Sequence, residues 1–424
     1  MLNILKQGHP KGLYLLFFVE MWERFSYYGM RALLVLYMVQ QFAFSTQKAS
    51  FVYGIYTGLV YLTPLIGGYI ADRYWGQRKC ITAGAILMSL GLFGLAINNY
   101  STFYISLILM ICANGMFKSN ISTIVGMLYK GDNTKKDSGF TIFYMGINLG
   151  ALLSPLVCGT LAVKYGFHIG FMSAGAGMVI GLALYKLLEN KFLGDCGKNI
   201  NNTTQEIKNG DSKLSDNDKK NLFTLFILII FSTIFWLGYE QAGSSLTLFA
   251  EYGINRVLGS YTIPTEYFQA LNPFFIIILA PLISTFWISL NKKNCEPNSV
   301  QKFSLAFLIL SIAYVILALA VKHTTDELIS PIWLLIYYFI ATIAELCISP
   351  IGLSLVSKLA PIKFASMIMG VWFLSSFLGN LFAGVFSGFY GKTDDFIFFM
   401  ILALILLSIS VLIIIIMPKL AKIK

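Results

Sequence analysis

The sequence predicts an all-α integral membrane protein with twelve spanning helices in two halves of six. Three observations lead to this class. Of the 424 residues, 57% are hydrophobic and 12% are charged, and the mean hydropathy is +0.73, whereas about a quarter of the residues of a soluble domain are charged. Apolar runs of roughly 20 residues, the length that crosses a bilayer as a helix, recur along the whole chain. One polar segment divides these runs into two equal groups.

The runs are too long and too evenly apolar for the short alternating strands of a membrane barrel. In chain order, the predicted spans are residues 12–40, 50–71, 79–98, 101–129, 139–163, 167–188, 221–245, 264–290, 301–322, 330–357, 362–389 and 394–417. The polar segment is rich in Asn, Asp, Lys, Ser and Gly and has little to bury, so we expect a flexible linker. The predicted domains are an N-terminal six-helix bundle over 1–188, a cytoplasmic linker over 189–220 and a C-terminal six-helix bundle over 221–424.

The distribution of basic residues predicts the orientation. If both termini are cytoplasmic, 23 of the 31 Lys and Arg residues lie on the cytoplasmic side and five lie outside, while Arg24, Arg31 and Lys118 fall within spans. By the positive-inside rule, this split predicts a multi-pass protein with both termini in the cytoplasm. It also explains the net charge of +11 without a nucleic-acid partner. The six cysteines are scattered without metal-ligand spacing and are interpreted as packing residues.

The loop between the second and third spans, "GGYIADRYWGQRK", is a candidate gate. It resembles the major facilitator signature G-x-x-x-D-R-x-x-G-x-R-[RK], at Gly68, Asp72, Arg73, Gly76, Arg78 and Lys79. In that fold, substrate binds near the midplane between two halves that rock. We expect Asp72, Arg73 and Arg78 to hold a cytoplasmic gate by charge pairing at helix ends. The alternative is an ordinary charged loop, which the spacing disfavours.

Ionisable residues inside the spans indicate function, because a charge at mid-bilayer costs roughly 2.5–3.5 kcal/mol or more. Residues 20, 24, 27, 28 and 31 are spaced by three or four, so Glu20, Arg24, Tyr27 or Tyr28, and Arg31 share one helical face, with Glu23 beside it. Lys118, Glu240 and Glu345 lie in three other spans. The acids and bases nearly balance, which suits a buried network that faces the bundle interior.

Four neutral polar residues in apolar surroundings are further candidates for a functional site within the spans: Tyr61, Asn148, Asn272 and Ser349. Two simpler interpretations stay open. The charges could form a static network that holds the two halves together, although pairs between halves would break whenever the halves part. Tyr61 and Asn148 could be packing residues, and Glu20 could be solvated one turn from the interface.

Four motifs give the chain a resemblance to the proton-dependent oligopeptide transporters, a branch of the major facilitators. The first is E-x-x-E-R at Glu20, Glu23 and Arg24. The second is "FYMGINLGALLSP" at 143–155, and the third and fourth are "YEQAGSS" at 239–245 and "ELCISPIGLSLVSKLAP" at 345–361. The resemblance covers nearly the whole chain.

The resemblance implies a role for each candidate residue. Arg31 and Lys118 would bind the carboxylate of a peptide, Glu345 its amino group, and Asn148 and Asn272 its backbone. Tyr27, Tyr28, Tyr61 and Trp372 would line the pocket, and Ser349 joins this substrate-binding set. Glu20, Glu23, Arg24 and Glu240 would carry or relay the proton. A zwitterion needs opposite charges at a fixed separation, and a desolvated carboxylate can take up a proton.

Three departures from the family pattern qualify the resemblance. The linker is too short for the two extra helices that bacterial members often carry between the halves. Ser119 stands where the family usually has Pro, which leaves the bend after Lys118 open. His9, His168 and His323 all lie near span ends, so a histidine proton site at mid-membrane is excluded and carboxylates must couple the proton.

Together, the residues and the resemblance predict a proton-coupled symporter of the cell inner membrane that imports di- and tripeptides by alternating access. The alternative is a proton-coupled transporter of another small solute, such as nitrate or a peptide-like metabolite, which the intact E-x-x-E-R motif disfavours. An enzyme is not expected, because the spans carry no nucleophile–base pair or metal cluster. We expect no cofactor or metal besides the coupling proton, membrane lipid as the surroundings, and a functional monomer.

Overall fold

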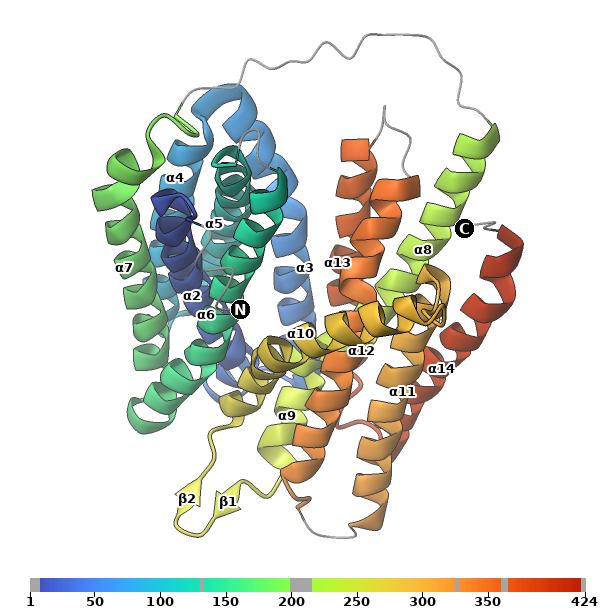
Figure 1. Cartoon of the computed structure of the whole chain (residues 1–424). Helices are drawn as coiled ribbons and strands as arrows, with labels where there is room; N and C mark the ends of the chain where they lie inside the picture. Colours follow the sequence, from blue (N-terminus) through green and yellow to red (C-terminus); the bar gives the residue numbers. More distant parts are fainter. Residues whose placement is uncertain (1–7, 130–132, 199–215, 325–327, 360–364, 421–424) are drawn as a thin grey trace. The chain divides into compact units, whose positions relative to one another are not determined.

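The computed structural model of the chain describes residues 8–129, 133–198, 216–324, 328–359 and 365–420, and nearly all of them are helical (Figure 1). The long helices before the polar segment are α2 (Lys11–Gln40), α3 (Thr46–Ile70), α4 (Gln77–Leu95), α5 (Tyr100–Met127), α6 (Asn133–Tyr165) and α7 (Phe167–Leu193). Those after it are α8 (Asp216–Tyr239), α10 (Leu271–Lys292), α11 (Ser299–His323), α12 (Ile332–Leu359), α13 (Ala365–Ser387) and α14 (Asp395–Leu420). The predicted all-α class is confirmed.

Within the described residues, ten helices are long and apolar enough to cross a membrane, and Val371–Ser387 is a shorter apolar helix. The first long helix, α2, is not among the ten, because Lys11, Glu20, Glu23, Arg24 and Arg31 interrupt its apolar sequence. The flanking helices extend into the predicted linker, 189–220, from both sides: α7 continues to Leu193 and α8 begins at Asp216. Its central part, residues 199–215, lies outside the described residues.

Several short features were not predicted. The expected span over 221–245 is interrupted: α8 ends at Tyr239, a 3-10 turn occupies Glu240–Gly243, and the short helix α9 follows at Ser245–Tyr252. A hairpin of two-residue strands follows, in which β1 (Val257–Leu258) pairs antiparallel with β2 (Tyr261–Thr262). A second 3-10 turn, Thr265–Ala270, leads into α10, and a π-helical turn, Ala71–Trp75, ends α3.

The chain forms two compact units. The first comprises residues 1–37 and 59–205, and the second comprises 38–58 and 206–424. Within the first unit, α4 packs against α5 and α7, and α6 packs against α7 (Figure 1). Within the second, α11 packs against α12 and α14, and α8 packs against α13. Large aromatic side chains such as Phe103 and Phe171 fill the first core, and Phe235 and Phe307 fill the second.

Small residues let α3 approach α5 closely inside the first unit. A Cβ atom on Gly67 would lie 2.0 Å from the carbonyl oxygen of Gly115. Thr63 Oγ1 donates to the Ile111 carbonyl oxygen at 3.0 Å, and Asn120 Nδ2 donates to the Gly67 carbonyl oxygen at 3.3 Å. Close backbone contact and interhelical hydrogen bonds are the means by which membrane helices associate without a hydrophobic driving force.

This contact predicts that alanine substitutions at two adjacent glycines differ in their effect on stability. The Gly67→Ala variant should lose roughly 1–3 kcal/mol of stability, because its new methyl group overlaps the backbone of α5. A Cβ atom on Gly68 would lie 3.6 Å from Ser119 Oγ, an ordinary contact. Gly68→Ala should therefore be neutral or gain up to about 1 kcal/mol of helix propensity. Thermal unfolding of the two purified variants in detergent tests this, and equal midpoints would contradict the close approach.

Candidate functional site

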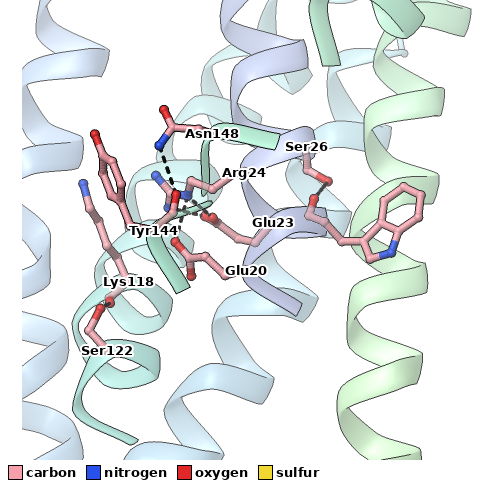
Figure 2. A network of polar contacts seen from close by, with 9 residues as sticks. Glu20, Glu23, Arg24, Ser26, Lys118, Ser122, Tyr144 and Asn148 are labelled. Carbon is pink, nitrogen blue, oxygen red and sulfur yellow. Dashed lines mark hydrogen bonds and ion pairs between the residues drawn. The ribbon is translucent and has the colours of Figure 1, made fainter. Parts of the chain in front are cut away.

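The first unit contains a buried cluster of two carboxylates and one guanidinium on α2 (Figure 2). Arg24 Nη2 donates to Glu23 Oε1 at 2.7 Å, and Arg24 Nε donates to the other oxygen of the same carboxylate. Arg24 Nε also lies 3.2 Å from Glu20 Oε1. The side chains of Glu20 and Arg24 are 3% exposed and that of Glu23 is fully buried. The cluster therefore holds two carboxylates around a single guanidinium, away from water.

The two carboxylates are held differently. Glu23 uses both oxygens in a bidentate contact with Arg24, the strongest geometry for such a pair. Glu20 makes one contact to the guanidinium, and its Oε2 atom is buried without a hydrogen-bond partner within the part of the chain that the structure describes. An added proton on Glu20 would thus leave the bidentate pair intact.

Glycines of the second sequence motif let α6 pack closely against α2 beside this cluster. A Cβ atom on Gly150 would lie 2.2 Å from the Met21 carbonyl oxygen, and one on Gly146 would lie 2.9 Å from the Phe17 carbonyl oxygen. The backbone of α6 is therefore in direct contact with α2 at the height of Glu20. The motif thus excludes water from the charges beside it, which strengthens their interaction.

Lys118 of α5 supplies a second cation near the cluster (Figure 2). Its Nζ atom lies 4.8 Å from the centre of the Tyr61 ring. Two further cation–aromatic contacts lie within α2. Arg24 lies 5.3 Å from the centre of the Tyr27 ring, and Arg31 lies 5.9 Å from the centre of the Tyr28 ring. Tyrosine faces thus flank all three cations that the sequence places inside the membrane.

Asn148 lies on α6 near the same cluster (Figure 2). Its Nδ2 atom donates to the Tyr144 carbonyl oxygen at 3.0 Å, one turn earlier in its own helix, and the residue is 6% exposed. The predicted residues Glu20, Glu23, Arg24, Lys118 and Asn148 are therefore brought together within one unit.

The second unit contains a separate network around Glu345 of α12. Tyr239 at the end of α8 donates its hydroxyl proton to Glu345 Oε2 at 2.5 Å. Asn272 Nδ2 of α10 lies 2.9 Å from the same oxygen, 2.6 Å from the Tyr239 hydroxyl and 3.1 Å from Thr342 Oγ1. Three helices thus fix the orientation of one carboxylate. Tyr239 was missed in the sequence, although it directly precedes Glu240 in the third motif.

Three other predicted residues of this unit are Glu240, Ser349 and Trp372. Glu240 begins the 3-10 turn after α8 and is 4% exposed. Ser349 is half-buried on α12, one turn after Glu345. Trp372 of α13 is buried, and a Cβ atom on Gly352 would lie 2.3 Å from its ring, so the indole packs closely on the backbone of α12.

The predicted gate residues all bind neutral groups. Asp72 accepts a hydrogen bond from Gln77 Nε2 at 2.7 Å, and Arg73 donates to the Tyr69 hydroxyl at 2.8 Å. Arg78 donates to the carbonyl oxygens of Gly194 and Cys196, both at 2.7 Å, where it caps the carboxyl end of α7. This end of a helix carries partial negative charge. The charge-paired gate stays a prediction.

Known proteins resemble the chain over nearly its whole length. The peptide transporter YePEPT of Yersinia enterocolitica is 33% identical, with 92% of this chain and 89% of the relative covered. The di-/tripeptide transporter of Lactococcus lactis subsp. cremoris is 30% identical, with 98% and 96% covered. The crystal structure of a variant of peptide transporter POT in complex with alafosfalin matches with a TM-score of 0.92 at 33% identity, covering 98% of this chain and 96% of that one.

A multi-pass membrane transporter of the major facilitator type is the class that this fold and these buried charges define. The predicted fold is therefore confirmed. The POT family model matches residues 78–209 and 188–402. The chain belongs to the POT family, which confirms the resemblance inferred from the four motifs, and it is a transporter and not an enzyme.

Proposed function

We propose that this chain is a proton-coupled symporter that imports di- and tripeptides by alternating access across the cell inner membrane, with both termini in the cytoplasm. It would work as a monomer, with protons as its coupling ion and no other cofactor. The relatives from Yersinia and Lactococcus are named as peptide and di-/tripeptide transporters, which supports the substrate class.

The observation that carries the coupling is the buried cluster on α2. Two carboxylates share one guanidinium, and Glu20 keeps one oxygen without a partner among the described residues. A proton bound there leaves one charged carboxylate paired with one guanidinium in a site shielded from water. Neutralising an acid also weakens its hold on Arg24, so protonation can shift the balance between two conformations. In this state the geometry favours Glu20 as the proton acceptor and Glu23 as the fixed partner of Arg24.

The charges of the two units suit the two ends of a peptide. Arg31 and Lys118 in the first unit would receive the carboxylate, and Glu345 in the second would receive the amino group. Tyr239 and Asn272 hold the carboxylate of Glu345 in one orientation, which lowers the entropy cost of binding an ammonium group. Asn148 would bind the peptide backbone, and Tyr27, Tyr28, Tyr61, Ser349 and Trp372 would line the pocket.

Uptake into proteoliposomes tests the function directly. Labelled dialanine should accumulate when the outside is more acidic than the inside, and excess unlabelled dipeptide should abolish the signal. Excess nitrate should leave it unchanged. Uptake without any stimulation by the proton gradient would overturn symport, and uptake that dipeptides do not compete with would overturn the substrate class.

A further inference from the structure

The first unit has a cavity of about 330 Å³ between α4 and α7, apart from the charges on α2. Its polar lining is Arg78 and Lys79 from α4, Lys186, Glu189 and Asn190 from α7, and Lys198 from the segment after α7. Thr82, Ala83 and Ile86 form the rest of its α4 wall. The orientation proposed above places this cavity at the cytoplasmic end of the helices.

The cavity carries a surplus of positive charge. Four of its lining residues are basic and one, Glu189, is acidic. Glu189 accepts from Lys186 Nζ at 2.5 Å. Lys198 Nζ lies 3.3 Å from Asp195, but that carboxylate is 92% exposed, so solvent weakens the pair. Within the described residues, Lys79 makes no ion pair, and it is exposed beside the cavity.

The cationic cavity is held in shape by a buried side chain. Arg78 is 5% exposed and donates to the carbonyl oxygens of Gly194 and Cys196 and, at 3.2 Å, to Asn190 Oδ1. The Arg78 backbone N–H also donates to the Gly197 carbonyl oxygen at 3.1 Å. These contacts fasten the segment after α7 to the start of α4. They thereby bring Lys198 to the same cavity as Lys79.

An apolar stripe continues from the cavity along α4. Ile86, Leu90 and Phe93 are 44%, 55% and 37% exposed. They are spaced by four and three residues, so they lie on one helical face. The cavity and the stripe thus present a cationic end followed by an apolar track, which matches a phosphate headgroup and an acyl chain.

We infer that this cavity binds the headgroup of an anionic phospholipid of the cytoplasmic leaflet, with an acyl chain along Ile86, Leu90 and Phe93. Basic cavities between membrane helices on this side attract anionic headgroups, and each lysine near an anionic surface adds to the affinity. A free phosphate ion would satisfy the lysines but would leave the apolar stripe unused.

Purified protein in detergent tests the inference. Dioleoyl phosphatidylglycerol should raise the thermal unfolding midpoint by several degrees more than dioleoyl phosphatidylcholine, because a ligand of the folded state stabilises it. Native mass spectrometry should show retained phosphatidylglycerol. The double variant K79Q/K198Q should bind phosphatidylglycerol roughly 30-fold more weakly. Native mass spectrometry measures the bound lipid directly, so it tests binding even if the double variant is itself less stable.

Lys164→Gln is the matched control, because Lys164 is an exposed lysine of the same unit in the last turn of α6. It should behave like the unsubstituted protein. An equal loss in Lys164→Gln would show a general charge effect and overturn the site. Equal shifts with the two lipids would overturn it as well. If millimolar inorganic phosphate reproduced the full shift, the occupant would be a free anion, and the lipid assignment would be wrong.

Discussion

Glu23→Gln is expected to abolish gradient-driven dipeptide uptake while sparing counterflow of dipeptide between equal proton concentrations. The substitution leaves one guanidinium and one carboxylate, Arg24 and Glu20, in the buried cluster. Glu20 is then the one carboxylate of the cluster that pairs with Arg24, so a proton on Glu20 would leave a buried guanidinium without a charged partner in the cluster, and protonation is no longer favourable. Counterflow needs only the movement of the loaded carrier, and Arg24 keeps Glu20 as its counter-charge at 3.2 Å. Uptake and counterflow in proteoliposomes measure the two activities.

Glu20→Gln separates coupling from structure in the same experiment. It keeps the bidentate contact between Glu23 and Arg24, so its unfolding midpoint should stay near that of the unsubstituted protein, while gradient-driven uptake is lost. Glu251→Gln serves as the control, because Glu251 pairs with Arg256 at 3.0 Å outside the cluster. That variant should keep both activities. If Glu23→Gln lost counterflow too, the cluster would be structural and not a proton site.

Glu345→Gln is expected to weaken dialanine binding by roughly tenfold to a hundredfold, because a charged hydrogen bond contributes about 1.5–3 kcal/mol. The loss should depend on the amino group of the substrate. The unsubstituted protein should prefer dialanine over N-acetyl-dialanine, and the variant should distinguish them much less. Competition against a labelled dipeptide measures both affinities.

Tyr239→Phe is the graded comparison for this experiment. It removes one neutral donor to Glu345 but keeps the charge, so we expect a loss of about twofold to tenfold. Tyr239 acts here by positioning the carboxylate. An unchanged preference for the free amino group in Glu345→Gln would show that Glu345 does not bind this end of the peptide.

The buried charges were visible in the sequence because an ionisable residue in an apolar run is costly and therefore informative. The helical period alone placed Glu20 and Arg24 on one face, and the structure pairs them. The two carboxylates could not be ranked this way, since both stand one turn or less from Arg24. Only the atomic contacts distinguish the bidentate Glu23 from the singly bound Glu20.

Other features were hidden for physical reasons. Tyr239 carries no charge and is one of 23 tyrosines, so nothing marked it before its contact with Glu345 was seen. The partners of Arg78 lie more than 100 residues away along the chain, so its neighbours in sequence suggested a charge pair. The break after α8 falls at Glu240–Gly243, inside a stretch, Asn221–Tyr252, that is apolar enough overall to count as one span.

That break has a mechanical consequence. A continuous helix transmits torque along its length, whereas the non-helical backbone of Ser244, with φ −131° and ψ −92°, interrupts the helix between α8 and α9. A Cβ atom on Gly243 would lie 1.7 Å from the Tyr53 hydroxyl oxygen, so a neighbouring side chain braces the joint from the side. Residues 245–252 therefore form a helix separate from the one that ends at Tyr239, and the side chain of Tyr239 is oriented by its contacts with Glu345 and Asn272.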